Sequence, residues 1–411
     1  MSADGRPGAT ASLRRPATIR ERCANILAAG LAGRLTHFHV EPDRLPDAAA
    51  CVAAVTRRRY PQLAIPYHSR WRHLDAGGVD RIAALRAALS GRPADEHARA
   101  KIDLIVVSVL LDAGAGQTWR FREEQSGRTF TRSEGLAVAS FRMVEAGLFS
   151  SDPSDPWQAD ARALSDLDED RVARGFQASA TNPLVGLDGR VALLKRLGRA
   201  MKGAPQIFGT GCPRLGHIFD ALRARARQGR VDAPTILELV LTGLEEIWPG
   251  RLELEGVSLG DTWPHPAAGG SGAAAGLVPL HKLSQWLTYS LVEPLEDAGL
   301  AVSGIEQLTG LAEYRNGGLF FDLGVLVPRH ADVTAVTHSP DSEIVVEWRA
   351  LTVALLDRLA PLVAVHLGLD AAELPLIKVL EGGTWAAGRE LAEARRAGAP
   401  PIRITSDGTV F

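Results

Sequence analysis

Residues 310–328 read GLAEYRNGGLFFDLGVLVP, a short polar segment followed by two glycines and a long apolar run. The glycine pair indicates a tight turn or a close approach of the backbone. Strand-forming residues fill 319–327 and Pro328 ends the run, so the pattern predicts a buried strand. A lone carboxylate, Asp322, interrupts this run and is costly to bury without a partner. Asp322 is therefore either a structural residue, held by backbone N–H groups or paired with Arg315, or a group used in chemistry.

The composition of the whole chain is that of an ordinary globular protein. Its 411 residues are 46% hydrophobic and 23% charged, and the net charge of −2 gives no sign of a nucleic-acid partner. No apolar run reaches membrane-spanning length, so no membrane association is expected. Three widely spaced cysteines, Cys23, Cys51 and Cys212, favour a reducing compartment, and a cytoplasmic location is expected. The chain has no CxxC pair, which argues against a thiolate zinc site.

Helical periodicity outweighs strand patterns along the chain, as in the amphipathic segment 232–248. The sequence predicts an α+β fold that is mainly α-helical, with a small mixed or antiparallel sheet. Residues 1–18 lack the apolar core of a signal peptide and are expected to form a flexible tail. The polar, proline-marked residues 151–170 predict a boundary between a helical part, 19–150, and an α+β part, 151–411. Both parts are expected to build one site.

A dense cluster of arginine, histidine and tryptophan follows Pro66 in the sequence YHSRWRH. Arg70 and Arg72 suit the binding of a carboxylate or phosphate, because guanidinium groups form rigid two-pronged hydrogen bonds. Trp71 is placed to stack on a planar substrate, and His68 adds a polar group. A solvated loop or a structural network with nearby aspartates is the alternative.

Two further segments carry polar groups next to apolar or rigid sequence. The apolar run 101–111 ends in Asp112 and a Gly-x-Gly sequence, which is typical of the rim of a site. The sequence GVSLGDTWPHP holds Asp261, Trp263 and His265 in a loop that two prolines make rigid. A carboxylate and an imidazole so close together fit a catalytic loop.

The sequence PLHKLSQWLTYSLVE predicts a helix with Pro279 in its first turn. His281, Gln285 and Tyr289 share one face of this helix, and Lys282 flanks it. Solvation alone would favour Glu and Lys, so this face is expected to form the wall of a pocket. The chain has no HExxH pattern, so His281 is not expected to bind zinc.

Long segments of this chain resemble the uracil-catabolism family of fungi and bacteria that includes Urc4 and Urg3. The resemblance runs from about residue 20 to the end and rests on HSRWRHLDAGGVDR, LLDAGAGQTW, RSEGLAVAS, NPLVGLDGR, LGDTWPHP, LVPLHKLSQWLTYSLVEPLE, LTGLAEYRNGGLFFDLGVL, EGGTWAAGR and SDGTVF. It implies a cytosolic role in a route that opens the uracil ring while ribose is attached and finally releases urea. A faint similarity of HSRWRH to the queuosine-nucleotide glycosidases, which are mostly helical, points the same way.

Such a route must break a C–N glycosidic bond, so the resemblance implies an N-glycosidase acting on a ribosylurea-like compound, with or without a 5′-phosphate. Asp322 or Asp261 would stabilise positive charge on the ribose or orient water. His265, His281 or Tyr289 would donate to the leaving urea.

The remaining candidate residues are expected to bind substrate. Arg70, Arg72 and Arg315 would hold ribose or phosphate, and Trp71 or Trp263 would stack on the ureido group. Glu313 and Asn316 complete the polar segment before the central glycines. The partner is a small ribosyl-ureido molecule and no cofactor is expected, whereas the sequence leaves the oligomeric state open. An amidohydrolase acting on the opened ureido chain, or a non-catalytic partner of pathway enzymes, are the alternatives.

Overall fold

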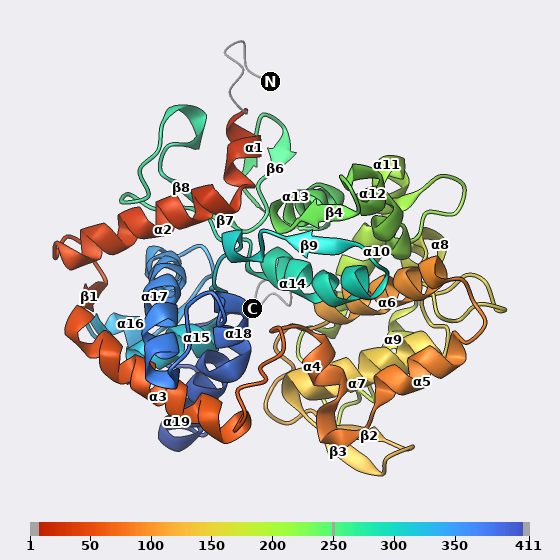
Figure 1. Ribbon diagram of the computed structural model, residues 1–411, viewed down its shortest axis with the longest axis horizontal. Helices are drawn as coiled ribbons and strands as arrows, with labels where there is room; N and C mark the ends of the chain where they lie inside the picture. Colours follow the sequence, from red (N-terminus) through yellow and green to blue (C-terminus); the bar gives the residue numbers. More distant parts are fainter. Residues whose placement is uncertain (1–7, 249–250, 406–411) are drawn as a thin grey trace. The chain divides into compact units, whose positions relative to one another are not determined.

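Helices make up most of the protein, and its strands are short (Figure 1). The computed structural model describes residues 8–248 and 251–405. Within these residues the strands pair only in twos, and the β1–β10, β2–β3, β5–β6 and β7–β8 pairs are antiparallel. The β4–β9 and β11–β12 pairs are parallel. The prediction of a mainly helical α+β fold with little sheet is confirmed.

The chain forms two compact units, and each of them is discontinuous in sequence. Among the described residues, unit 1 comprises 8–68, 251–285 and 305–405, and unit 2 comprises 69–248 and 286–304. The chain does not pass from one unit to the other near residue 150, where the sequence predicts a boundary, because residues 69–248 all belong to unit 2. The described part of the predicted tail, residues 8–18, is largely helical.

Unit 1 is built on the long apolar helix α17. Its helices are α1 (Ala9–Leu13), α2 (Pro16–Leu31), α3 (Leu45–Arg59), α15 (Tyr314–Asp322), α16 (Asp332–Ala335), α17 (Glu343–Leu367), α18 (Leu376–Val379) and α19 (Trp385–Arg396), with a π-helical turn η7 (Leu380–Thr384) before α19. Its strands are β1 (Phe38–Val40), β5 (Glu253–Leu254), β6 (Val257–Ser258), β7 (Thr262–Pro264), β8 (Leu277–Pro279), β10 (Leu326–Pro328), β11 (Thr337–His338) and β12 (Arg403–Ile404).

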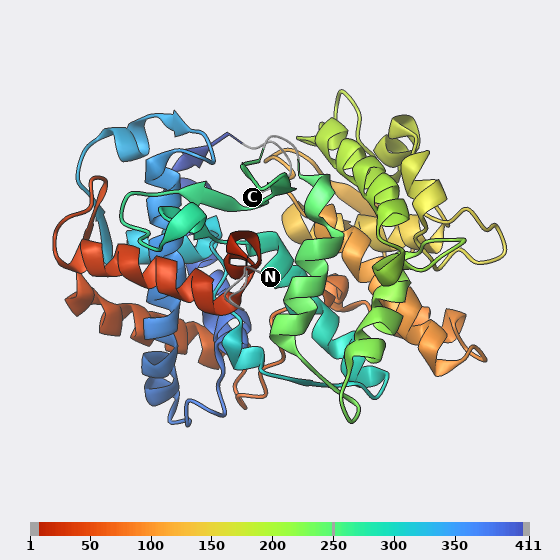
Figure 2. The same ribbon diagram turned by 90° about the horizontal axis from the view of Figure 1, so that it is seen from above.

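Helices α2 and α3 cross α17 and pack against it (Figures 1 and 2). By length and composition α17 would be able to cross a membrane, but 67% of its apolar window is buried inside the protein. Its apolar side chains are therefore accounted for by the core of unit 1.

Unit 2 is organised around α6, whose apolar run is almost entirely buried. Its helices are α4 (Trp71–Leu74), α5 (Arg81–Ala88), α6 (Ala94–Leu110), α7 (Arg132–Glu145), α8 (Ala161–Ser165), α9 (Glu169–Gly175), α10 (Leu187–Gly203), α11 (Pro205–Phe208), α12 (Ile218–Arg225) and α13 (Ala233–Gly243). Its strands are β2 (Phe121–Glu123), β3 (Arg128–Phe130), β4 (Arg230–Asp232) and β9 (Ala301–Ser303). Helix α14 (Lys282–Asp297) begins in unit 1 and continues in unit 2. Pro279, predicted in the first turn of α14, ends β8 instead.

The central stretch 310–328 departs most from expectation, because the predicted strand over 319–327 is wrong. Helix α15 includes residues 319–322 of this segment, and only residues 326 and 327 at its end belong to the strand β10. The carboxylate of Glu313 caps the first turn of this helix by accepting backbone N–H bonds. A Cβ at Gly317 would lie 2.7 Å from the indole of Trp348, so this glycine lets α15 approach α17 closely.

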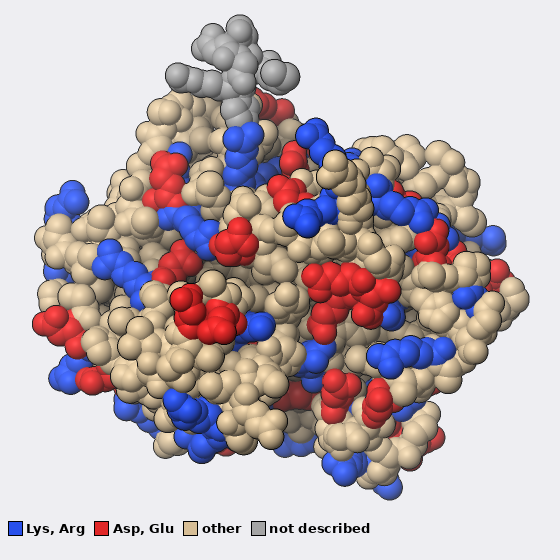
Figure 3. Space-filling view, in the orientation of Figure 1, with Lys and Arg blue, Asp and Glu red and all other residues tan. Residues whose placement is uncertain are grey.

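Acidic and basic side chains are mixed over the face of the molecule that Figure 3 shows. This distribution agrees with the small net charge of −2. The face therefore offers no broad field of one sign that would attract a polyanion.

Candidate functional site

The carboxylate of Asp261 in unit 1 is fully engaged. It accepts hydrogen bonds from both terminal nitrogens of Arg349 at 2.7 Å, from the indole N–H of Trp263 at 2.6 Å and from the backbone N–H of Lys282 at 2.9 Å. These four bonds use the acceptor positions that a carboxylate offers. Burial opposes the charge, but the Arg349 guanidinium outweighs it and holds the pKa of Asp261 well below its usual range. Asp261 therefore stays ionised and fixes the start of α14 against α17.

His281 precedes α14 and is also engaged internally. Its Nε2 lies 3.0 Å from the carbonyl oxygen of Leu13, so the ring donates its Nε2 proton there. Burial lowers the pKa of His281, so the ring is neutral at physiological pH.

Glu313 combines burial with spare hydrogen-bonding capacity. One carboxylate oxygen accepts the backbone N–H of Arg315 at 2.7 Å, and the other accepts that of Asn316. Burial raises the pKa of the Glu313 carboxyl, and the two N–H bonds and the charge of Lys282 oppose this effect. Since each oxygen keeps an acceptor position, Glu313 can exchange a proton with a bound molecule.

Two buried amide side chains lie against the segment that leads into Glu313. The Nε2 group of Gln285 donates to Thr309 at 2.9 Å, and the Nδ2 group of Asn316 donates to the carbonyl of Leu311 at 3.3 Å. Gln285 is 0% exposed and Asn316 is 1% exposed. In the described part of the chain, neither amide oxygen has a hydrogen-bond partner. Two orphaned acceptors beside a protonatable carboxyl group suit a ligand rich in N–H groups.

Asp322 has a different environment from that expected. Its carboxylate receives both terminal nitrogens of Arg396, at 2.7 and 2.6 Å, and its side chain is only 1% exposed. The prediction that Arg315 pairs with Asp322 is wrong, because the Arg315 guanidinium donates to the carbonyl of Gly398 at 3.0 Å. The geometry is that of a buried structural ion pair.

Two of the three predicted histidines in unit 1, His68 and His265, each face a buried glutamate. Nδ1 of His68 lies 2.9 Å from Glu381, whose other oxygen accepts from Arg59 at 2.9 Å. Nε2 of His265 lies 3.4 Å from Glu347, while its Nδ1 accepts a backbone N–H. Both rings are therefore held in fixed orientations.

In unit 2, Arg70 and Asp112 come together as an ion pair of 2.9 Å. Ser133 donates to the Asp112 carboxylate at 2.7 Å, and Arg70 also contacts Ser133 and His73. The guanidinium lies over the ring of Trp286 at 5.6 Å. Burial lowers the pKa of Arg70, and the Asp112 charge opposes this shift. Two residues predicted from separate motifs thus form one buried network.

The other predicted residues of unit 2 are held within it. The indole of Trp71 is buried and donates to the carbonyl of Ser290 at 2.9 Å, so its polar edge is engaged in packing. Arg72 pairs with Glu293 at 2.6 Å, and Tyr289 is buried in α14. The predicted site residues thus belong to both units, and their union in one site stays a prediction.

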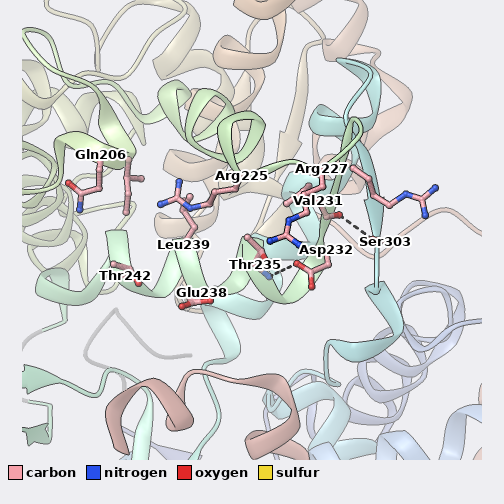
Figure 4. Close-up of a pocket in the computed structure, with 12 residues that line it drawn as sticks. Gln206, Arg225, Arg227, Val231, Asp232, Thr235, Glu238, Leu239, Thr242 and Ser303 are labelled. Atoms are coloured by element: carbon pink, nitrogen blue, oxygen red, sulfur yellow. Dashed lines mark hydrogen bonds between the residues drawn. The ribbon is translucent and has the colours of Figure 1, made fainter. Parts of the chain in front are cut away.

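A cavity of about 710 Å³ lies in unit 2 (Figure 4). Its charged side chains come from α12, from the segment between α12 and β4, from β4 and from α13: Arg225, Arg227, Arg230, Asp232 and Glu238. The three arginines are exposed, and Asp232 is engaged in capping α13 through the N–H of Thr235. The cavity contains none of the residues predicted from the sequence, and it suits the binding of an anion better than proton transfer.

Several residues of these networks were missed in the sequence. Arg349, Arg396 and Glu381 lie far along the chain from the groups they pair with. Glu347 alone gave a signal, because it is a carboxylate within the apolar sequence VVEWRALTV and raises the same question as Asp322.

Comparisons with known proteins agree with the resemblance over nearly the whole length. The model of a family described as "Protein of unknown function (DUF1688)" matches residues 12–411. The chain is 39% identical over 412 residues to Uracil catabolism protein 4 of Lachancea kluyveri, covering 92% of this chain and 93% of that protein. It is also 39% identical over 405 residues to Protein urg3 of Schizosaccharomyces pombe, covering 96% of each.

Proposed function

The chain belongs to the DUF1688 family, and from this premise we propose that it is a uracil-catabolism enzyme that hydrolyses an N-glycosidic bond. The similarity to Uracil catabolism protein 4 supports a role in uracil catabolism. The substrate of the proposed reaction is a ribosylurea-like compound with or without a 5′-phosphate, and the products are urea and ribose or its phosphate.

The observation that carries the proposal is the environment of Glu313. A ureido group presents several N–H donors, and the orphaned amide oxygens of Gln285 and Asn316 are acceptors buried beside the segment that bears Glu313. A ligand with N–H groups would satisfy acceptors that are otherwise costly to bury.

In the proposed reaction Glu313 acts first as a general acid. The bond between C1′ and the ureido nitrogen breaks, its electron pair goes to nitrogen, and the Glu313 proton is transferred to that nitrogen. The positive charge that remains on ribose is captured by water at C1′, and the water proton returns to the Glu313 carboxylate. The raised pKa of Glu313 suits the first step, because a larger fraction of this carboxyl group is protonated than in an exposed glutamate.

Asp261 is a positioning residue in this scheme. All its acceptor positions are used, so it is unsuited to activate water, but its charge is permanent. It holds the first turn of α14, which carries Lys282 and Gln285.

The test is incubation of the purified protein with ribosylurea and, separately, with its 5′-phosphate, with measurement of urea and reducing sugar. Equal amounts of urea and sugar are expected. Glu313→Gln keeps the shape of the side chain and one of the two oxygens that cap the helix. It cannot supply the proton, so kcat should fall by about 10²–10⁴-fold. The wild-type kcat should also decline as the pH rises through the raised pKa of Glu313.

The matched control is Glu306→Gln, which alters an exposed carboxylate in the short 3₁₀ helix before residue 309. It should leave kcat unchanged. Release of ammonia without reducing sugar would replace the glycosidase with an amidohydrolase. No turnover of either compound would contradict both activities.

A further inference from the structure

Glu347 is a fully buried carboxylate at the centre of a cluster in unit 1 that the proposed reaction does not use. One oxygen accepts the backbone N–H groups of His37 at 3.2 Å and Phe38 at 2.9 Å. The other faces Nε2 of His265 at 3.4 Å. Over residues 8–248 and 251–405, no lysine or arginine forms an ion pair with Glu347. A buried carboxylate without a permanent cation is costly unless a metal ion or a proton neutralises it.

The ring of His37 extends this cluster towards solvent. Its Nε2 lies 3.6 Å from Glu343, and its Nδ1 lies 2.9 Å from Nε2 of His330. When Nδ1 donates to His330, the lone pair on Nε2 of His37 points to the glutamates. Such a second hydrogen bond fixes the tautomer and orientation of metal-binding histidines.

Glu343 and Glu347 are four residues apart on α17, so their side chains share one face of the helix. One ligand atom from each glutamate and one from His37 all lie within 4.8 Å of one another. A zinc ion about 2.0–2.2 Å from each ligand requires ligand atoms about 3.3–3.6 Å apart in a tetrahedron. The 3.6 Å between His37 and Glu343 is close to this spacing.

We infer that His37, Glu343 and Glu347 bind a divalent transition-metal ion such as Zn²⁺, and that His330 orients His37. One imidazole and two carboxylates are ligands that this class of ion accepts. The side chains of His37 and Glu343 are 14% and 41% exposed, which leaves a path for the ion and for water as a further ligand. This site shares no residue with Glu313, Gln285 and Asn316.

The test is calorimetric titration of the chelator-treated full chain with Zn²⁺, together with the visible absorption of bound Co²⁺. One ion per chain is expected. Glu343→Gln alters the most exposed ligand and should leave the fold intact, so its zinc affinity should fall at least about 10-fold. His37→Gln should weaken binding similarly, and His330→Phe by about 10–100-fold.

The matched control is His39→Gln. His39 lies in β1, two residues after His37, and its exposed side chain is 3.0 Å from the exposed Glu41. This variant should bind Zn²⁺ as the wild type does, and so should Glu313→Gln, which separates this inference from the proposed glycosidase. Failure of the wild type to bind either ion would overturn the inference. Equal affinity in wild type, His37→Gln and Glu343→Gln would also overturn it.

Discussion

At the scale of single residues, the buried carboxylates of unit 1 differ in what neutralises them. Asp261 and Asp322 each accept hydrogen bonds from both terminal nitrogens of an arginine, and Glu381 is hydrogen-bonded to Arg59 and His68. Glu313 is instead bound by backbone N–H groups, and its pKa is raised by burial. Ion pairs of the first kind hold the fold together, whereas the second environment suits proton transfer.

The Glu381→Gln substitution should reveal the stability that a paired carboxylate contributes. Burial raises the pKa of Glu381, but His68 and Arg59 outweigh it and lower the value to about 2, below an ordinary 4.5. The contribution is present above pH 4.5 and is lost as the pH falls through about 2. At pH 7 we expect a loss of about 3 kcal/mol in the free energy of unfolding, measured in urea.

Glu390→Gln is the matched control, because Glu390 pairs with Arg58 of the same helix α3 but both side chains are more than half exposed. The expected change is less than about 1 kcal/mol. Similar losses for the two variants, or a loss for Glu381→Gln that does not shrink in acid, would contradict the prediction.

Glu313→Gln should show the opposite dependence on pH. The pKa of Glu313 is raised from 4.5 by burial, so its contribution to stability is complete below pH 4.5 and is lost as the pH rises through the raised value. The free energy of unfolding of the wild type, relative to the variant, should therefore fall with increasing pH. Urea titrations between pH 4 and pH 8 check this. If the stability of the wild type relative to the variant increases with pH, Glu313 does not have a raised pKa.

At the scale of secondary-structure elements, the close packing of α15 on α19 leaves no room for an added side chain. A Cβ at Gly388 would lie 2.1 Å from the carbonyl oxygen of Arg315, and the two helices cannot separate without disrupting the Asp322–Arg396 pair. Gly388→Ala should therefore lower the free energy of unfolding by about 1–3 kcal/mol or more.

A glycine with free space around it provides the comparison. Gly203 ends α10, and a Cβ there would meet no atom within 4 Å. Gly203→Ala should range from neutral to about 1 kcal/mol more stable, because alanine restricts the unfolded chain. Thermal or urea unfolding measures both variants. A tolerated alanine at Gly388 would mean that α15 and α19 pack less closely than described.

At the scale of the whole molecule, unit 2 depends on residues 286–304, which follow residues 251–285 of unit 1 in the sequence. Residues 286–304 supply β9, which pairs with β4, and Ser290, whose carbonyl accepts from Trp71. A fragment of residues 69–250 should thus lack cooperative unfolding. Joining 286–304 to it through a Gly/Ser linker of about 20 residues should restore a cooperative transition, measured by circular dichroism. A cooperative transition in the shorter fragment would show that this segment is dispensable.

The sequence by itself determined the helical character of the protein, because long apolar periodicities such as that of α13 are local features of the chain. It also singled out Glu313, Gln285, Asn316 and Asp112 as polar groups in unusual surroundings. It mistook 319–327 for a strand, because residues of high strand propensity also suit a helix that is buried and capped.

Only the tertiary structure decided which polar groups meet. The partner of Asp322 is Arg396, 74 residues away, and the proposed metal ligands join His37 to α17 across more than 300 residues. No local pattern encodes such pairs, since the cost of burying a charge depends on the groups that folding brings beside it.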